Sequence, residues 1–237
     1  SFSSPLINDL SANDQQLMTR AQSSLEHWYN AVVQECPQAD FFAYGIDEKG
    51  GKKAGDAGIQ TYEELLQREI LVFQLLRQQV STVKTFTSVS DGAADVLGSH
   101  LNQANYHSKK LDASPETSAQ EIAKWKAHGA EVFTYHNPQA GIEDPHLYRS
   151  KFGLYLLQHG FDGAMDFAYQ YTISKFNFRD SNTVYPSVWN DFDTPPGENR
   201  DHVFAYPTTD GVIDTVQWDG FREGVDDVRY FQPLKNL

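Results

Sequence analysis

The sequence predicts an α/β fold built on a parallel β-sheet. Short apolar stretches that end in turn residues alternate along the 237 residues with longer stretches in which apolar residues recur at helical spacing. The clearest strand, residues 41–46, is almost entirely apolar, as is typical of a parallel strand covered on both faces. Alternation of this kind favours parallel strands joined by right-handed crossovers. About five strand–helix units are visible, too few for a closed barrel of eight.

The first half of the chain contains three expected helices and three expected strands. Thr61, with Glu64 three residues later, forms a capping box that starts the second helix. The strand after that helix is rich in β-branched residues. In order, the expected elements are a helix at 15–35, a strand at 41–46, a helix at 61–80, a strand at 83–89, a short helix at 93–98 and a strand at 101–106.

The second half continues the alternation around one long segment without a clear pattern. Gly129 is expected to end a helix, because a left-handed glycine commonly follows the last helical residue. The aromatic residues of the long segment indicate that it is an ordered cover rather than a disordered loop. The expected elements are a helix from Ser118, a strand at 131–135, a helix at 146–160, a strand at 164–171, the long loop at 173–200, a strand at 203–206, a turn at 207–211 and a helix at 218–234.

Composition excludes several classes of function. The net charge of −13 argues against nucleic acid and anionic membranes as partners, since both need a basic surface. Cys36 is the only cysteine, which excludes an internal disulfide and a thiolate metal cluster. No window approaches the ~18 consecutive apolar residues of a membrane span. The N-terminus lacks the basic region of a signal peptide, and because it does not begin with Met we expect a fragment or a processed chain.

Polar side chains follow several of the expected strands. Asp47 and Glu48 follow the first, and the other pairs are Ser90 with Asp91, His136 with Asn137, and Gln170 with Tyr171. In a barrel the strand ends converge on one face. Paired carboxylates among aromatic rings are typical of glycoside hydrolysis, where an acid protonates the leaving oxygen and rings hold the sugar.

Two other interpretations of the acid pair stay open. The carboxylates could merely cap the following turn or helix, and Asp47, Glu48 and His136 could bind a metal ion in a metal-dependent hydrolase. The known motifs for phosphate, dinucleotide or zinc binding and the serine elbow do not occur. We therefore expect no cofactor and no metal.

Four stretches of the chain resemble one family of enzymes. The sequence resembles the C-terminal half of the catalytic domain of glycoside hydrolase family 123 and its relatives, long catalogued as a domain of unknown function, over residues 4–234. The stretches that carry the resemblance are AYGIDE, VFTYHNP, LYRSKFGLYLLQHGFDGAMDFAYQY and HVFAYPTTDGVIDTVQWDGFREGVDDVRYF.

The resemblance implies a (β/α)₈ TIM-barrel type of fold and a substrate-assisted reaction. Residues 1–237 would form a single partial barrel domain that supplies only the C-terminal strand–helix units, with another chain or an upstream segment completing the barrel. Members hydrolyse β-N-acetylgalactosaminides by attack of the substrate's own acetamido oxygen on the anomeric carbon. Glu48 would be the general acid/base, and Asp47 would orient the acetamido group. A secreted or periplasmic location is implied.

The resemblance and the positions of the strand ends also suggest which residues face a carbohydrate substrate. For four of them, core packing or structural hydrogen bonding is an equally open interpretation: Tyr135, His136, Asn137 and Tyr171. Arg222, Glu223, Asp226 and Asp227 of the closing motif are expected to be structural instead. The alternative function is a non-catalytic glycan-binding or structural protein on a degenerate hydrolase fold. The expected substrate-binding residues are Tyr44, Tyr135, His136, Asn137, Gln170, Tyr171 and Trp189.

Overall fold

The computed structural model divides the chain into two compact units, and each is described by itself. The first unit is Ser1–Phe133 and the second is Thr134–Leu237. The structure describes residues 2–3, 16, 19, 23, 27, 29–38, 40–45, 61–108, 115–135, 138, 140–166, 169–171 and 202–236. The expectation of one partial barrel domain over the whole chain stays a prediction.

A parallel β-sheet forms the centre of the first unit, which confirms the predicted α/β class. The strands are β1 (Phe2–Ser3), β2 (Phe42–Tyr44), β3 (Lys84–Val89), β4 (Gln103–His107) and β5 (Glu131–Tyr135), hydrogen-bonded in that order. The pairs β1–β2, β2–β3 and β3–β4 are parallel. The strand order of the sheet is linear and continues after β5 to β6 (Gly163–Ala164), so no closed barrel is seen among the described residues.

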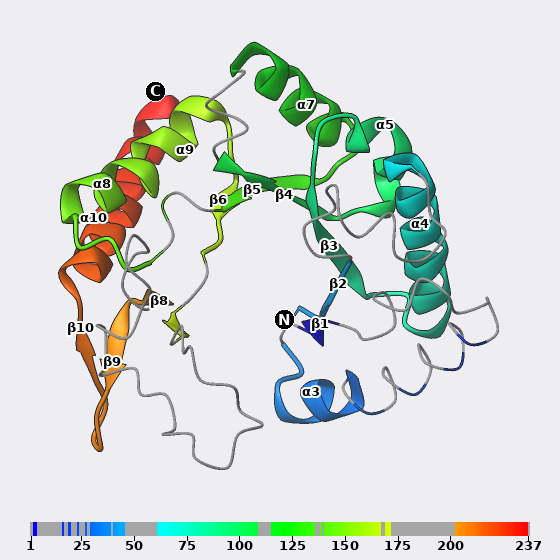
Figure 1. The fold of residues 1–237 in the computed structure, drawn as a ribbon, viewed down its shortest axis with the longest axis horizontal. Helices are drawn as coiled ribbons and strands as arrows, with labels where there is room; N and C mark the ends of the chain where they lie inside the picture. The colour runs from blue at the N-terminus through cyan, green and yellow to red at the C-terminus, as the bar shows by residue number, and fades with distance from the viewer. Residues whose placement is uncertain are drawn as a thin grey trace. The chain divides into compact units, whose positions relative to one another are not determined.

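The helices described for the first unit overlap the predicted ranges, although the helix expected at 15–35 is described as an element only over Asn30–Glu35. They are α3 (Asn30–Glu35), α4 (Tyr62–Gln79), α5 (Ala93–Leu97) with the following 3₁₀ turn η2 (Gly98–His100), and α7 (Pro115–Ala127). Figure 1 shows α4 lying alongside β2 and β3. Both hydrogen bonds of the expected capping box between Thr61 and Glu64 are present. Gly129 has a φ of 77°, as expected of a residue that ends a helix. None of the described helices is long and apolar enough to cross a membrane.

The second unit contains more and shorter elements than expected. They are α8 (Pro145–Lys151), α9 (Leu154–His159), β6, β7 (Gln170–Tyr171), β8 (His202–Val203), β9 (Ala205–Pro207), β10 (Val212–Asp214), α10 (Val216–Phe231) and η3 (Gln232–Asn236). The expected strand at 164–171 is therefore two short strands, and β10 was not expected. The expected turn at 207–211 joins β9 and β10 into an antiparallel hairpin. The expected loop at 173–200 lies outside the described residues.

Close backbone contact explains why the single helix expected at 146–160 is two helices. A β-carbon on Gly153, the residue before α9, would lie 2.5 Å from the carbonyl oxygen of Arg149 and 2.9 Å from the backbone of Gly224. The backbone torsions of Gly153, −117° and −112°, are not helical. The helical turn therefore ends at Lys151, and α9 begins anew at Leu154.

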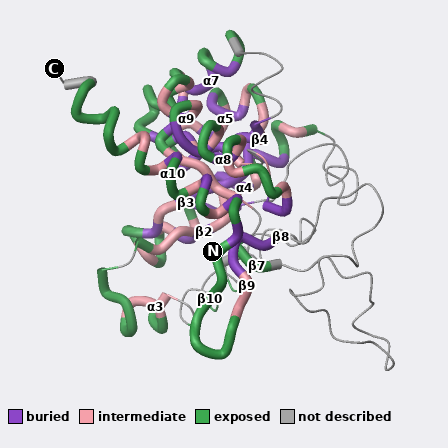
Figure 2. The backbone as a smooth tube through the Cα atoms, turned by 90° about the vertical axis from the view of Figure 1, so that its left-hand side faces the viewer, coloured by how far each residue is buried: buried purple, intermediate pink, exposed green. Residues whose placement is uncertain are grey.

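Apolar spacing predicts that α10 is buried along a face of Phe221, Val225, Val228 and Phe231, but its fully buried positions include two glycines on another part of the helix. Its buried residues are Gln217, Gly220 and Gly224, whereas Phe231, expected inside, is 48% exposed. A β-carbon on Gly220 would overlap the carbonyl oxygen of Pro145 at the start of α8. Helices α8 and α10 therefore pack at backbone distance, which a row of large side chains would prevent. Figure 2 shows the exposed end of α10 and the exposed outer strand of the β9–β10 hairpin.

Candidate functional site at the carboxyl edge of the sheet

The strand before the predicted acid pair is shorter than the predicted strand at 41–46, and residue 46 lies outside the described residues. Strand β2 closes at Tyr44, and the Gly45 amide still donates a hydrogen bond to the carbonyl oxygen of Phe86 at 2.8 Å. The chain therefore reaches Asp47 and Glu48 two and three residues beyond the last hydrogen-bonded residue of a parallel strand. Both acids lie outside the described residues, so their proposed roles stay predictions.

The ring of Tyr44 lies on one face of the sheet beside the end of β2. It is half-buried and stacks on Phe86 of β3, with 4.6 Å between ring centroids and 21° between planes. Its neighbours Ala43 and Gly45 point to the opposite face, because successive residues of a strand alternate. The ring is therefore held by the fold while part of it stays accessible, which suits a surface that contacts a sugar ring.

The sheet face that carries Tyr44 becomes polar toward its carboxyl edge. Strand register places Phe86 beside Gln103 and Ser88 beside Asn105 on this face. Ser88 is 4% exposed and Asn105 is 7% exposed. Buried polar side chains cost stability unless they find partners, so a protein interior rarely gathers them without a use. Sequence reasoning did not identify this face, because polar residues occur on both faces of β3 and no alternation separates them.

Glu69 is a fully buried acid on the opposite, helix-covered face of the sheet. It lies in the middle of α4 and has no exposed surface. A β-carbon built at Gly45 would overlap Oε1 of Glu69 and would lie 2.7 Å from Oγ1 of Thr87. Sequence reasoning missed this residue. The available signal was its spacing, four residues after Leu65 and four before Phe73, inside the apolar stripe of the helix.

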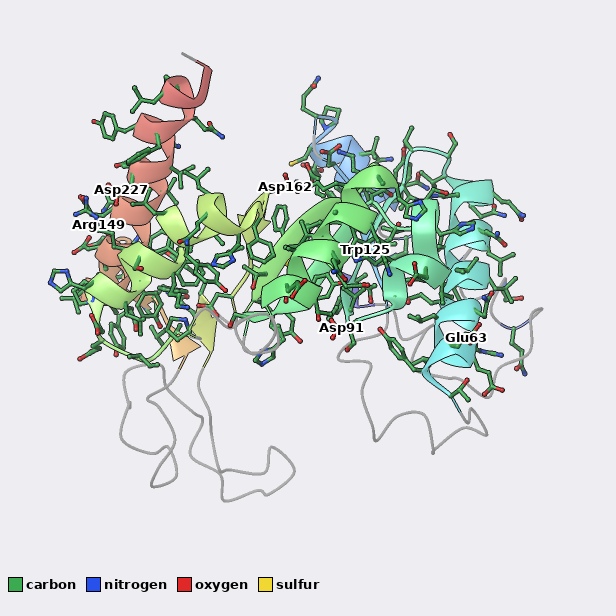
Figure 3. All side chains as sticks on the ribbon, turned by 90° about the horizontal axis from the view of Figure 1, so that it is seen from above. Glu63, Asp91, Trp125, Arg149, Asp162 and Asp227 are labelled. Carbon is green, nitrogen blue, oxygen red and sulfur yellow. The ribbon has the colours of Figure 1, made fainter. Side chains whose placement is uncertain are left out.

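The turn after β3 is held by two side chains from helices. The Ser90 amide donates to the Tyr62 hydroxyl at 3.0 Å, and the Gly92 amide donates to Oε2 of Glu121 at 3.1 Å. Burial raises the pKa of Tyr62 to about 12. Asp91, between the two anchored amides, is exposed (Figure 3). The turn therefore displays one predicted strand-end carboxylate from a fixed backbone.

A buried pair of aromatic side chains contacts Glu121, the acid that holds the turn after β3. Nε1 of Trp125 donates to the Tyr106 hydroxyl at 2.8 Å, and that hydroxyl lies 3.4 Å from Oε2 of Glu121. Burial raises the pKa of Tyr106. Nζ of Lys124 contacts Oε1 of Glu121 at 3.0 Å. The acid that anchors Gly92 is therefore satisfied by partners from β4 and α7.

The remaining predicted binding residues belong to the second unit or lie outside the described residues. Tyr135 ends β5 and is half-buried. Gln170 donates from Nε2 to the carbonyl oxygen of Ala205 at 2.7 Å, a bond that joins β7 to β9. Tyr171 pairs with His202 through its backbone. His136, Asn137 and Trp189 lie outside the described residues.

The charged residues of the closing motif are structural, as expected. Arg149 of α8 forms two hydrogen bonds to Asp227 of α10, at 2.7 and 2.8 Å, and these bonds lower the pKa of the Asp227 carboxyl (Figure 3). The other members form ion pairs within the same unit: Glu223 with Arg149, Arg222 with Asp214 and Asp219, and Asp226 with Arg229. The motif ties α10 to α8 and β10.

The metal-site interpretation is not tested by the structure. Within the described ranges, no group of three or more His, Cys, Asp or Glu side chains is placed to hold a metal ion. The three candidates, Asp47, Glu48 and His136, all lie outside those ranges. The question therefore falls to experiment.

Comparison with known proteins shows the fold. No protein-family model and no curated protein sequence matches the chain. Among solved structures, a family 123 glycoside hydrolase from Clostridium perfringens, described for hydrolysis of glycolipid glycans, is similar with a TM-score of 0.55 and 11% sequence identity. The match covers 93% of this chain and 37% of that structure, so the chain spans just over a third of its length. The chain thus has an α/β fold distantly similar to that of a glycoside hydrolase.

Proposed function

We propose that this chain is part of a glycosidase that hydrolyses a β-N-acetylhexosaminide, with Asp47 and Glu48 as its catalytic carboxylates. The observation that carries the proposal is the end of β2. A parallel strand of a glycoside hydrolase-like fold closes beside a stacked, half-buried tyrosine and leads directly into two consecutive acids. Enzymes with parallel sheets place their chemistry at this edge.

In the proposed reaction the substrate supplies the nucleophile. The oxygen of its acetamido group attacks the anomeric carbon, the bond to the leaving oxygen breaks, and Glu48 gives that oxygen its proton. Asp47 accepts a hydrogen bond from the acetamido N–H and so favours the attack. Water then attacks the anomeric carbon, the bond from that carbon to the acetamido oxygen breaks, and the Glu48 carboxylate takes a proton from the water, which restores the acetamido group and the acid. Tyr44 lies where its ring can support the sugar.

In this proposal another chain or an upstream segment supplies the strands that close the barrel, as the family resemblance implies. Tyr135, His136, Asn137, Gln170, Tyr171 and Trp189 keep their predicted roles as substrate contacts. The experiments therefore use the natural full-length protein.

The acetamido requirement tests the mechanism. Wild-type protein is assayed with an aryl N-acetylgalactosaminide, with the matched galactoside that lacks the acetamido group, and with the N-trifluoroacetyl analogue. We expect turnover of the first, a much slower reaction of the third because its oxygen is a weaker nucleophile, and no reaction of the second. Equal turnover of the first two substrates would contradict substrate assistance.

The acid is tested by Glu48→Gln beside Glu63→Gln, a matched change of an exposed acid on α4. Because a general acid contributes about 10²- to 10⁴-fold, Glu48→Gln should lose that much rate, whereas the control keeps it. Unchanged hydrolysis by Glu48→Gln would exclude this acid. Binding of the glycan by calorimetry without turnover would favour the glycan-binding alternative, and loss of activity in EDTA would favour a metal-dependent hydrolase.

A further inference from the structure

A carboxyl group occupies a core position of α4. The neighbouring residues of the buried stripe are apolar, with Leu65 2% and Phe73 0% exposed, and Glu69 between them is also 0% exposed. Burying a carboxyl group costs far more than burying a leucine or methionine at the same place. Natural sequences break such rules mainly at functional sites, which directs attention to what Glu69 touches.

Glu69 lies against Gly45, the residue that follows β2 and still bonds to β3. Gly45 donates its amide to Phe86, and the space where a side chain would stand is filled by Oε1 of Glu69 and by Thr87, whose Oγ1 and Cβ would lie 2.7 and 2.8 Å from a β-carbon. Gly45 is not among the glycines with positive φ. Glycine is therefore needed here for close approach rather than for backbone conformation.

A second polar side chain of α4 reaches the end of the neighbouring strand. Tyr62 lies seven residues before Glu69, two helical turns away on the same side of the helix. Its hydroxyl accepts the Ser90 amide after β3, and the charge of Glu69 contributes to its raised pKa. One helix thus contacts the carboxyl ends of β2 and β3 through two polar side chains.

We propose that Glu69 is a positioning residue of the active site proposed above. Its carboxyl group holds Gly45 against Thr87 and so fixes the direction in which the chain leaves β2 toward Asp47 and Glu48. This inference rests on the proposed function, because the segment it directs carries the proposed catalytic pair.

The first test replaces the carboxyl group by an apolar side chain of similar size. Glu69→Met should lower kcat about 10- to 100-fold, the cost of a slight misplacement, with KM within about twofold of wild type. Its Tm should stay the same or rise, because a well-packed apolar residue stabilises a core position at least as well as a buried carboxyl. Leu66→Ala, which removes a side chain 1% exposed from the same helix, is the control: Tm should fall and kcat should remain.

The second test asks whether Glu69 acts through Gly45. Gly45→Ala should also lower kcat, because its methyl group displaces Glu69. In the Gly45→Ala/Glu69→Ala double variant the two losses should not multiply, since each change breaks the same contact. Multiplying losses would contradict the proposal. So would a loss of kcat in Glu69→Met that comes with a fall of Tm as large as that in Leu66→Ala.

The results separate failure of the inference from failure of the proposed function. An active wild type that is disabled by Glu48→Gln but unaffected by Glu69→Met overturns only the role of Glu69. A full-length protein that binds the glycan but never hydrolyses it, or an active Glu48→Gln variant, overturns the catalytic pair and with it the role of Glu69.

Discussion

Both units bury aromatic rings, but the first unit also buries acidic side chains, whereas the acids in the described part of the second unit stay at least partly exposed. In the first unit, Glu69 and Glu121 on helices and Asn105 in the sheet are buried. In the second unit, rings of Tyr148, Phe152 and Phe204 form the buried cluster, against which Trp218 and Phe221 pack. Its ion pairs lie at the surface.

This difference shows which part of the molecule contains the buried polar groups that lower its stability. Polar groups inside the first unit gather beside the ends of β2 and β3, whereas the second unit is built for close packing of rings and backbones. Buried polar groups are costly, and proteins keep them chiefly where a site requires fixed geometry. The comparison supports the proposal that the first unit, which contains Asp47 and Glu48, carries the catalytic pair.

The largest effect is expected from Trp125→Ala. The side chain is fully buried and donates to Tyr106, so its removal should lower the free energy of unfolding by about 3–5 kcal/mol. Denaturant unfolding measures the loss, and hydrogen exchange should show it first in peptides from β3 and β4. A loss below about 1 kcal/mol would mean that the polar network does not support the first unit.

Gly220→Ala should have the next largest effect, and it concerns the second unit. The new methyl group would overlap the carbonyl oxygen of Pro145, so α8 and α10 must move apart, at a cost of about 1–3 kcal/mol. Gly211→Ala is the control, because a β-carbon there meets open space. Equal stability of the two variants would contradict the close helix contact.

Tyr62→Phe should lower stability by about 1 kcal/mol at neutral pH, because the Ser90 amide loses its acceptor. It should also change how the free energy of unfolding depends on pH in the alkaline range. The pKa of Tyr62 is raised from 10.0 to about 12, so between those values the folded state holds a proton that the unfolded state has released, and stability falls as pH rises. The free energy of unfolding, measured from pH 9 to 12, should fall less steeply with rising pH in the variant. An unchanged slope would contradict the burial of this hydroxyl.

Arg149→Met should have the smallest effect. The arginine side chain is 48% exposed, and water and salt screen its bonds to Asp227. We expect a Tm decrease that shrinks with added salt. Because Arg149 lowers the pKa of Asp227, its contribution is present at neutral pH and disappears as pH falls through the lowered pKa. A Tm loss as large as that of Gly220→Ala would mean that surface ions, rather than backbone packing, hold α8 to α10.

Local patterns predicted the first unit well. The capping box at Thr61, the apolar stripe of α4 and the β-branched run of β3 depend on neighbouring residues, so they are visible in the sequence. The separation of α8 from α9 and the glycine face of α10 depend on contacts between segments that are distant along the chain. Spacing alone cannot show these, and the apolar face predicted for α10 was accordingly only partly right.

The candidate site likewise has a part that local sequence patterns predict and a part that they do not. The strand end before Asp47 was predictable, because an apolar run followed by acids and glycines is a local signal. Glu69, Ser88 and Asn105 were not found, since a polar residue in the primary sequence looks exposed until its strand register or helix packing is known. The buried polar groups of the first unit thus mark the limit of reasoning from pattern alone.

The claim that Glu48 gives a proton to the leaving oxygen is tested most directly by changing how much that oxygen needs one. Glu48→Gln and wild type in the full-length protein are compared on an N-acetylgalactosaminide with a dinitrophenyl leaving group, which departs without a proton, and on one with an alkyl leaving group, which does not. The account predicts that the variant nearly keeps the first rate and loses about 10²- to 10⁴-fold of the second. Equal losses on both substrates, or no loss on either, would contradict it.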